Sequence, residues 1–123
     1  MEGDWELETL LSLDGSSYEF GQGYIIELKV EKTDKTEQRP HGISYALVLR
    51  QKGKAPLIRF DNSHAVERPG GQYVRKSRAF DHWHRSGRDR GRPYAFTTSL
   101  KLLDDFFREV KRVLDERGIP NDI

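Results

Sequence analysis

The sequence predicts an α+β fold, in which an antiparallel sheet of four or five strands packs against one long C-terminal helix. Two observations support this prediction: consecutive segments with an apolar residue at every second position, and one apolar stripe at helical spacing near the end of the chain. A chain of 123 residues has room for one hydrophobic core, so we expect a single domain over residues 1–123.

Three strands follow one another in the middle of the chain. Residues 24–31 and 43–50 alternate between apolar and polar side chains, and residues 57–60 follow a hairpin turn at 51–54. Consecutive strands joined in this way most simply form an antiparallel meander with one covered face. We expect a fourth strand from the segment 73–85.

A helix is predicted at each end of the chain. The C-terminal helix begins after Thr97 or Thr98 and ends near Gly118. Its expected buried stripe consists of Leu100, Leu103, Phe106, Phe107, Val110, Val113 and Leu114. Burying such side chains contributes about 1.5–3 kcal/mol each. Residues 5–11 predict a short N-terminal helix, with an edge strand as the alternative.

Composition excludes several classes of protein. The chain has no cysteine, which rules out disulfides, thiolate zinc sites and cysteine nucleophiles. The acidic first residues lack the pattern of a signal peptide, and the apolar runs are too short to span a membrane. We therefore expect a cytoplasmic protein without a membrane partner.

Charge is distributed unevenly, although the net charge is only +1. The segment 1–23 is acidic, whereas the segment 75–92 is strongly basic. Basic side chains interleaved with aromatic ones are typical of RNA binding, and a solvated loop is the alternative. The candidate substrate-binding residues are Arg75, Lys76, Arg78, Trp83, Arg88 and Arg90.

Three of the four histidines lie in the segment 61–94, which also holds the candidate catalytic residues His64, His82, His84, Arg85 and Tyr94. In a strand, His82 and His84 would share one face and Trp83 would take the other. Imidazoles exchange protons near neutral pH, and arginines can clamp a phosphate. These residue types suit a ribonuclease that needs no metal ion or other cofactor.

Two alternatives use the same histidines. His64, His82, His84 and Asp81 could instead ligate a metal ion in a hydrolase, although His-x-His spacing is unspecific. The histidines could also be ordinary surface or hydrogen-bonding residues. His41, in the turn Arg39-Pro40-His41-Gly42, is expected to cap a strand end, with access to the site as the alternative.

Five motifs occur in order along most of the chain. They are Leu10-Leu11-Ser12-Leu13-Asp14-Gly15, Arg39-Pro40-His41-Gly42-Ile43-Ser44-Tyr45, Phe60-Asp61-Asn62-Ser63-His64-Ala65-Val66, Asp81-His82-Trp83-His84-Arg85 and Arg92-Pro93-Tyr94-Ala95-Phe96-Thr97. Together they resemble the TumE-like toxins of bacterial and archaeal toxin–antitoxin modules. The chain departs from the shorter toxins of this kind by a longer and more basic insertion at 69–78. Whether the basic residues of this insertion belong to the active site therefore stays open.

The resemblance implies a small toxin encoded beside a DNA-binding antitoxin, while the ribonuclease chemistry is inferred from the residues. Our leading hypothesis is an RNA-cleaving toxin that its antitoxin holds silent. A metal-dependent hydrolase is the second hypothesis, and a non-enzymatic module that binds nucleic acid or protein is the third. The sequence leaves open the RNA target, the antitoxin and the oligomeric state, a homodimer included.

Overall fold

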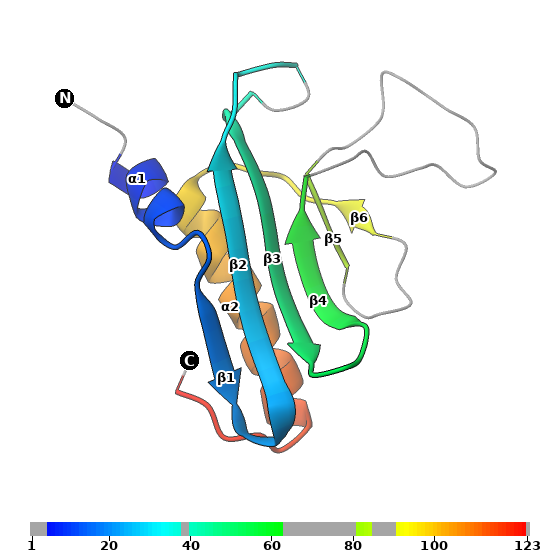
Figure 1. The fold of residues 1–123 in the computed structure, drawn as a ribbon. Coiled ribbons are helices and arrows are strands. Elements are labelled where there is room, and N and C mark those ends of the chain that lie inside the picture. Colours follow the sequence, from blue (N-terminus) through cyan, green and yellow to red (C-terminus); the bar gives the residue numbers. More distant parts are fainter. Residues whose placement is uncertain (1–4, 38–39, 63–80, 85–90, 123) are drawn as a thin grey trace.

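The computed structural model describes residues 5–37, 40–62, 81–84 and 91–122, which form a sheet and two helices (Figure 1). In chain order the elements are α1 (Trp5–Ser12), β1 (Ser17–Phe20), the 3-10 turn η1 (Gly21–Gly23), β2 (Tyr24–Lys32), β3 (Ile43–Gln51), β4 (Pro56–Asp61), β5 (His82–His84), β6 (Arg92–Pro93) and α2 (Ser99–Glu116). Each strand pairs antiparallel with the next, which gives the order β1-β2-β3-β4-β5-β6. The predicted α+β class, with a meander and a helix at each end, is confirmed.

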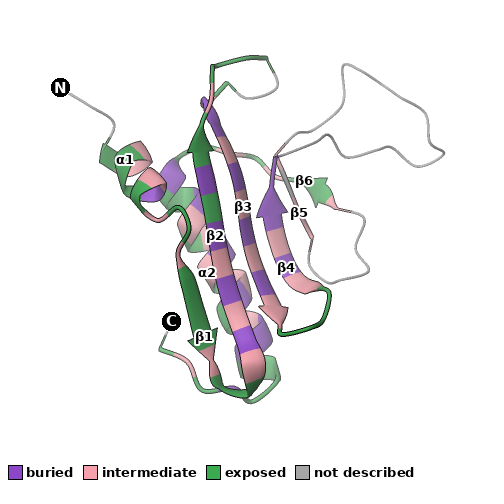
Figure 2. Cartoon of the chain, in the orientation of Figure 1, coloured by how far each residue is buried: buried purple, intermediate pink, exposed green. Residues whose placement is uncertain are grey.

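The two central strands show why the sequence folds in this way. Strands β2 and β3 pair over nine positions, from Tyr24 opposite Gln51 to Lys32 opposite Ile43. Buried residues alternate with more exposed ones along both strands, as Figure 2 shows. The buried set of β2 is Tyr24, Ile26, Leu28 and Val30, and that of β3 is Ile43, Tyr45, Leu47 and Leu49. One face of the sheet is therefore apolar and covered.

Helix α2 covers this face (Figure 1). The Thr98 hydroxyl caps it by accepting from the backbone N–H of Lys101 at 3.1 Å. After the helix, Gly118 adopts φ 71°, a left-handed conformation that glycine accommodates without strain. The prediction that Leu100 belongs to the buried stripe is wrong, since Leu100 is 38% exposed and Leu102 is fully buried. Leu100 and Leu102 are two positions apart in the sequence, which places them about 200° apart around the helix axis. Only one of them can therefore face the sheet.

The sheet has more strands than the four or five expected, since six occur within the described residues. The additional strands β1 and β6 are four and two residues long, too short for an alternating pattern to mark them as strands in the sequence. Strand β5 lies within the segment predicted to form a fourth strand. In the part of the chain that the structure describes, no helix is long and apolar enough to cross a membrane.

The contact between α2 and the sheet predicts the cost of mutations along the helix. Replacing the fully buried Phe106 with alanine should lower the free energy of unfolding by about 3–5 kcal/mol, because it opens a cavity beside Phe60. Replacing the more exposed Leu100 should cost less than about 1 kcal/mol. Urea denaturation of both variants checks this, and equal losses would mean that the assigned helix orientation is wrong.

Candidate functional site

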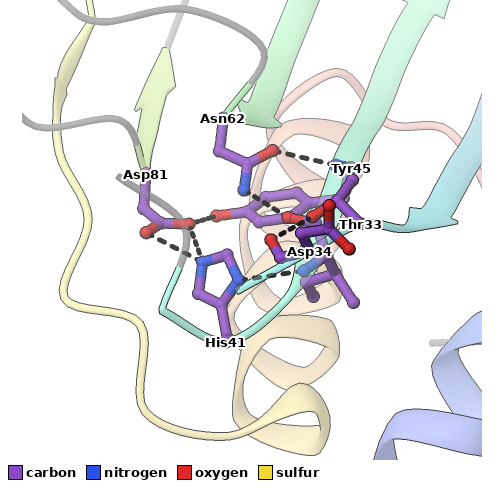
Figure 3. A network of polar contacts seen from close by, with 7 residues as sticks. Thr33, Asp34, His41, Tyr45, Asn62 and Asp81 are labelled. Carbon is purple, nitrogen blue, oxygen red and sulfur yellow. Dashed lines mark hydrogen bonds and ion pairs between the residues drawn. The ribbon is translucent and has the colours of Figure 1, made fainter. Parts of the chain in front are cut away.

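A network of polar side chains joins β3 to the residue that precedes β5 (Figure 3). The carboxylate of Asp81 lies 2.9 and 3.0 Å from Nε2 of His41, and it accepts a hydrogen bond of 2.7 Å from the Tyr45 hydroxyl. All three side chains are shielded from solvent, with exposed fractions of 10% for His41 and 15% for Asp81. We call His41, Tyr45 and Asp81 the Asp81 network.

His41 uses both of its ring nitrogens. The backbone N–H of Ile43 donates to Nδ1 at 3.3 Å, so Nδ1 is an acceptor and Nε2 carries the proton that is donated to Asp81. The ring of Phe96 lies against the imidazole, with 4.2 Å between their centroids. His41 thus caps the start of β3, as the turn motif suggested, and also binds Asp81, the residue before β5.

Tyr45 is a donor in this network over the whole physiological pH range. Burial, and next the neighbouring Asp81 carboxylate, raise the pKa of Tyr45 above its usual value. The hydroxyl therefore stays protonated, and its proton is directed at Asp81. The network presents two donors to a single carboxylate, which matches the needs of a shielded negative charge.

Asn62 extends the pairing of β3 and β4 beyond the end of β4. Its side-chain oxygen accepts from the backbone N–H of Tyr45 at 2.9 Å, and its amide nitrogen donates to the carbonyl of Ile43 at 2.8 Å. These groups copy the pattern of a strand backbone, so a fully buried polar side chain satisfies two backbone groups of β3. Asn62 thereby ties the start of β3 to the residue after β4, beside the Asp81 network.

A second cluster lies on the face of the sheet away from α2. Strand pairing sets Arg59 directly opposite His84, and Asp61 opposite position 82. Because Phe60 packs against α2, its neighbours Arg59 and Asp61 point to the other face. The Arg59 guanidinium forms an ion pair with the fully buried Asp61 carboxylate. We call Arg59, Asp61 and His84 the open-face cluster.

Two of the predicted site residues lie instead on the side of α2. The indole of Trp83 stacks on Phe60 with 5.3 Å between ring centroids, and the Arg92 guanidinium lies 5.1 Å from its centre. The Tyr94 hydroxyl donates to the Asp105 carboxylate at 2.6 Å. Trp83 and Tyr94 line a small cavity of about 190 Å³. The fold therefore separates these two aromatic residues from the open-face cluster.

Several predicted site residues lie outside the described residues: His64, Arg75, Lys76, Arg78, Arg85, Arg88 and Arg90. For His82 the description covers the backbone, which belongs to β5. Asp81, proposed as a metal ligand, is engaged by His41 and Tyr45. Within the described parts of the chain, no three His, Asp or Glu side chains gather as a metal site would require.

Sequence reasoning missed Arg59 and the link between His41 and Asp81. Arg59 carried a local signal, since a charged residue between the apolar Ile58 and Phe60 must point away from the core. Its position opposite His84 depends on the register between β4 and β5. These two strands are separated in the chain by the 20 residues 62–81. No local pattern encodes that register.

The contact between Tyr94 and Asp105 predicts a pH effect. Burial alone would raise the pKa of Asp105, but hydrogen bonds from Lys101 and Tyr94 outweigh it and hold that pKa below its usual value. A carboxyl with a lowered folded pKa stabilises the fold above its unfolded pKa, and this stabilisation is lost as the pH falls through the folded pKa. Tyr94→Phe should therefore raise the pKa of Asp105 and move this acid loss to higher pH.

Carbon-detected NMR titration of the carboxyl groups measures this shift directly. Asp115 is the control, because Asn121 and Lys111 lower its pKa and Tyr94 is not among its partners. Its titration should be unchanged in the variant. An unchanged Asp105 titration would mean that the hydrogen bond from Tyr94 is not formed in solution.

Comparison with known proteins identifies the family. A sequence model described as Toxin TumE matches residues 9–114, which is most of the chain. No curated protein and no solved structure gives a significant match. The family match confirms the resemblance carried by the five motifs, and it makes the protein a toxin of a toxin–antitoxin module with an antitoxin as its partner. The chain belongs to the TumE family of toxins.

Proposed function

We propose that this toxin cleaves RNA without a metal ion, on the face of the β4–β5 pair that points away from α2. One observation carries the proposal: strand pairing sets Arg59 directly opposite His84. Directly opposed residues of antiparallel strands have Cβ atoms about 4.5–5.5 Å apart, so both side chains can reach one phosphate group. Metal-independent RNA cleavage uses groups that transfer protons and a cation that stabilises the charge on the phosphate.

The chemistry proceeds by attack of a ribose 2′-hydroxyl on the adjacent phosphate. An imidazole removes the proton of that hydroxyl, the new P–O bond forms, and the bond to the 5′ oxygen breaks as that oxygen receives a proton. We assign one of these transfers to His84 and the other to His82, its neighbour but one on the same strand. Arg59 stabilises the charge on the phosphate oxygens, together with Arg85, which the sequence predicted as a catalytic residue.

The ion pair with Asp61 suits Arg59 for this role. The contact with Asp61 uses Nε of the guanidinium, and a guanidinium has two further nitrogens that donate hydrogen bonds. Asp61 is fully buried, whereas Arg59 is 38% exposed. A buried partner fixes the orientation of the guanidinium while its outer end stays open to a ligand, which favours a planar contact with two phosphate oxygens.

The remaining residues would bind the RNA or support the strand. Arg75, Lys76, Arg78, Arg88 and Arg90 are proposed to bind the phosphates of the RNA backbone. We give Trp83 and Tyr94 a supporting role beneath β5. The Trp83 indole already contacts Phe60 and Arg92, and the Tyr94 hydroxyl already donates to Asp105. In the cell, the antitoxin would keep the ribonuclease silent.

An assay on a mixed RNA substrate, with and without chelator, tests the proposal. His84→Ala should lower the cleavage rate by about 10²–10⁴-fold, and chelator should leave the rate unchanged. Arg59→Ala should also be severe, and Arg59→Lys should recover little because an ammonium lacks the planar fork. Arg50→Ala is the matched control, since Arg50 forms an ion pair with Glu27 and pairs with residues far from β5.

The outcomes separate the three functional hypotheses. Cleavage that stops in chelator and returns with added metal would favour the metal-dependent hydrolase and contradict the acid–base mechanism. Full activity in a His82→Ala/His84→Ala double variant would contradict both enzymatic hypotheses at this site. A folded wild-type protein that binds RNA without cleaving it would favour the binding module.

Binding to RNA should depend steeply on salt if the proposed phosphate contacts exist. Each contact contributes about 0.7 log units of affinity per log unit of salt for single-stranded RNA. A triple alanine variant at Arg75, Lys76 and Arg78 should therefore reduce the salt slope by about 0.7 for each lost contact. Filter binding in a His84→Ala background measures this without cleavage. The control is Lys54→Ala in the β3–β4 turn, and a triple variant with the same slope as this control would exclude the three residues from the RNA site.

A further inference from the structure

We propose that Asp81, held by His41 and Tyr45, is a positioning residue that fixes β5 in the register that the open-face cluster requires. Its catalytic consequence rests on the proposed function, whereas the anchoring of β5 can be measured independently. In the proposed cleavage mechanism, none of the three residues of the Asp81 network transfers a proton or contacts the phosphate. Positioning of β5 is therefore a separate role for them.

Strand β5 needs an anchor because it is very short. It consists of three residues, which pair with three positions of β4 on one side and with β6, itself two residues long, on the other. Such short pairings are weak by themselves. A slip of one residue would also exchange the two faces of the strand, and it would carry His84 from the open face to the side of α2.

Asp81 supplies this anchor from the position immediately before β5. Its carboxylate accepts from His41 and from Tyr45, and its backbone carbonyl accepts from the backbone N–H of Tyr94 at 2.9 Å. One residue thereby joins the turn before β3, β3 itself and the segment after β6. Charge-assisted hydrogen bonds of this kind are about twice as strong as neutral ones, and they depend on geometry.

The geometry favours positioning over proton transfer for His41. Both ring nitrogens are engaged, one by the backbone of Ile43 and one by Asp81, and Phe96 packs on the ring. By strand alternation, Asp81 shares the α2 side with Trp83, whereas His84 lies on the other face. Figure 3 shows the imidazole directed at the Asp81 carboxylate, which also accepts the hydrogen bond from the Tyr45 hydroxyl.

Four variants test the anchor. Tyr45→Phe and Asp81→Asn keep the shape of the side chains and remove one donor or the charge. In both, the amides of Trp83 and His84 should exchange with deuterium at least about tenfold faster, while the amides of β2 and β3 keep their protection. The matched control is Tyr24→Phe, which removes another shielded tyrosine hydroxyl, the one that accepts from Arg117 at 3.1 Å.

The two remaining variants separate positioning from catalysis. The amide nitrogen of His41→Gln can occupy the place of Nε2 and donate to Asp81, but it cannot transfer a proton. His41→Gln should therefore retain cleavage within about threefold of wild type with an unchanged pH profile, whereas His41→Ala should lose about 10–10²-fold in kcat with little change in KM.

Each result supports or overturns one proposal. Unchanged exchange of β5 in Tyr45→Phe and Asp81→Asn would overturn the anchor, whether or not the protein cleaves RNA. A His41→Gln variant as inactive as His41→Ala, with β5 still protected, would make His41 a proton-transfer residue and overturn positioning. A wild-type protein without ribonuclease activity would overturn the proposed function alone, because the exchange measurement would still decide whether Asp81 anchors β5.

Discussion

Burial of one face of the sheet beneath α2 is the interaction on which the remaining structure depends. Phe60 of β4 and Phe106 of α2 meet edge to face, with 5.8 Å between their ring centroids, inside a core that both layers fill. A strand presents successive residues to opposite faces, so the burial of Phe60 also directs Arg59 and Asp61 away from the helix. The apolar core therefore determines which side chains face away from α2, the face on which Arg59, Asp61 and His84 lie.

The Asp81 network shows how the fold accommodates a charge that is largely shielded from water. A carboxylate in such a place is costly unless donors surround it. His41 and Tyr45 provide those donors, and burial keeps the Tyr45 hydroxyl protonated by raising its pKa. Both donors reach the carboxylate with β3 and β5 arranged as they are here, which supports the proposed anchoring of β5 in this register. A polar network can thus specify a structure that apolar burial leaves underdetermined.

Strand β5 divides its residues between two tasks. Trp83 belongs to the side of α2, where Phe60 and Arg92 enclose its indole and Tyr94 binds Asp105 beneath it. His84 belongs to the open face, opposite Arg59. A strand suits this division, because the packing of one face stiffens the backbone that carries the other. Trp83 and Tyr94, both predicted as site residues from the sequence, thus lie on the α2 side, away from His84.

The sequence by itself determined the class of fold, because apolar alternation in residues 24–31 and 43–50 and a helical stripe near the C-terminus are local patterns. The motifs along the chain also determined the toxin family. Local patterns could not decide whether Leu100 or Leu102 faces the sheet, since both are apolar and the choice depends on how the helix docks. Nor could they bring Arg59 to His84 or His41 to Asp81. Those contacts join residues 25 and 40 positions apart, so only the pairing of strands across the folded sheet decided them.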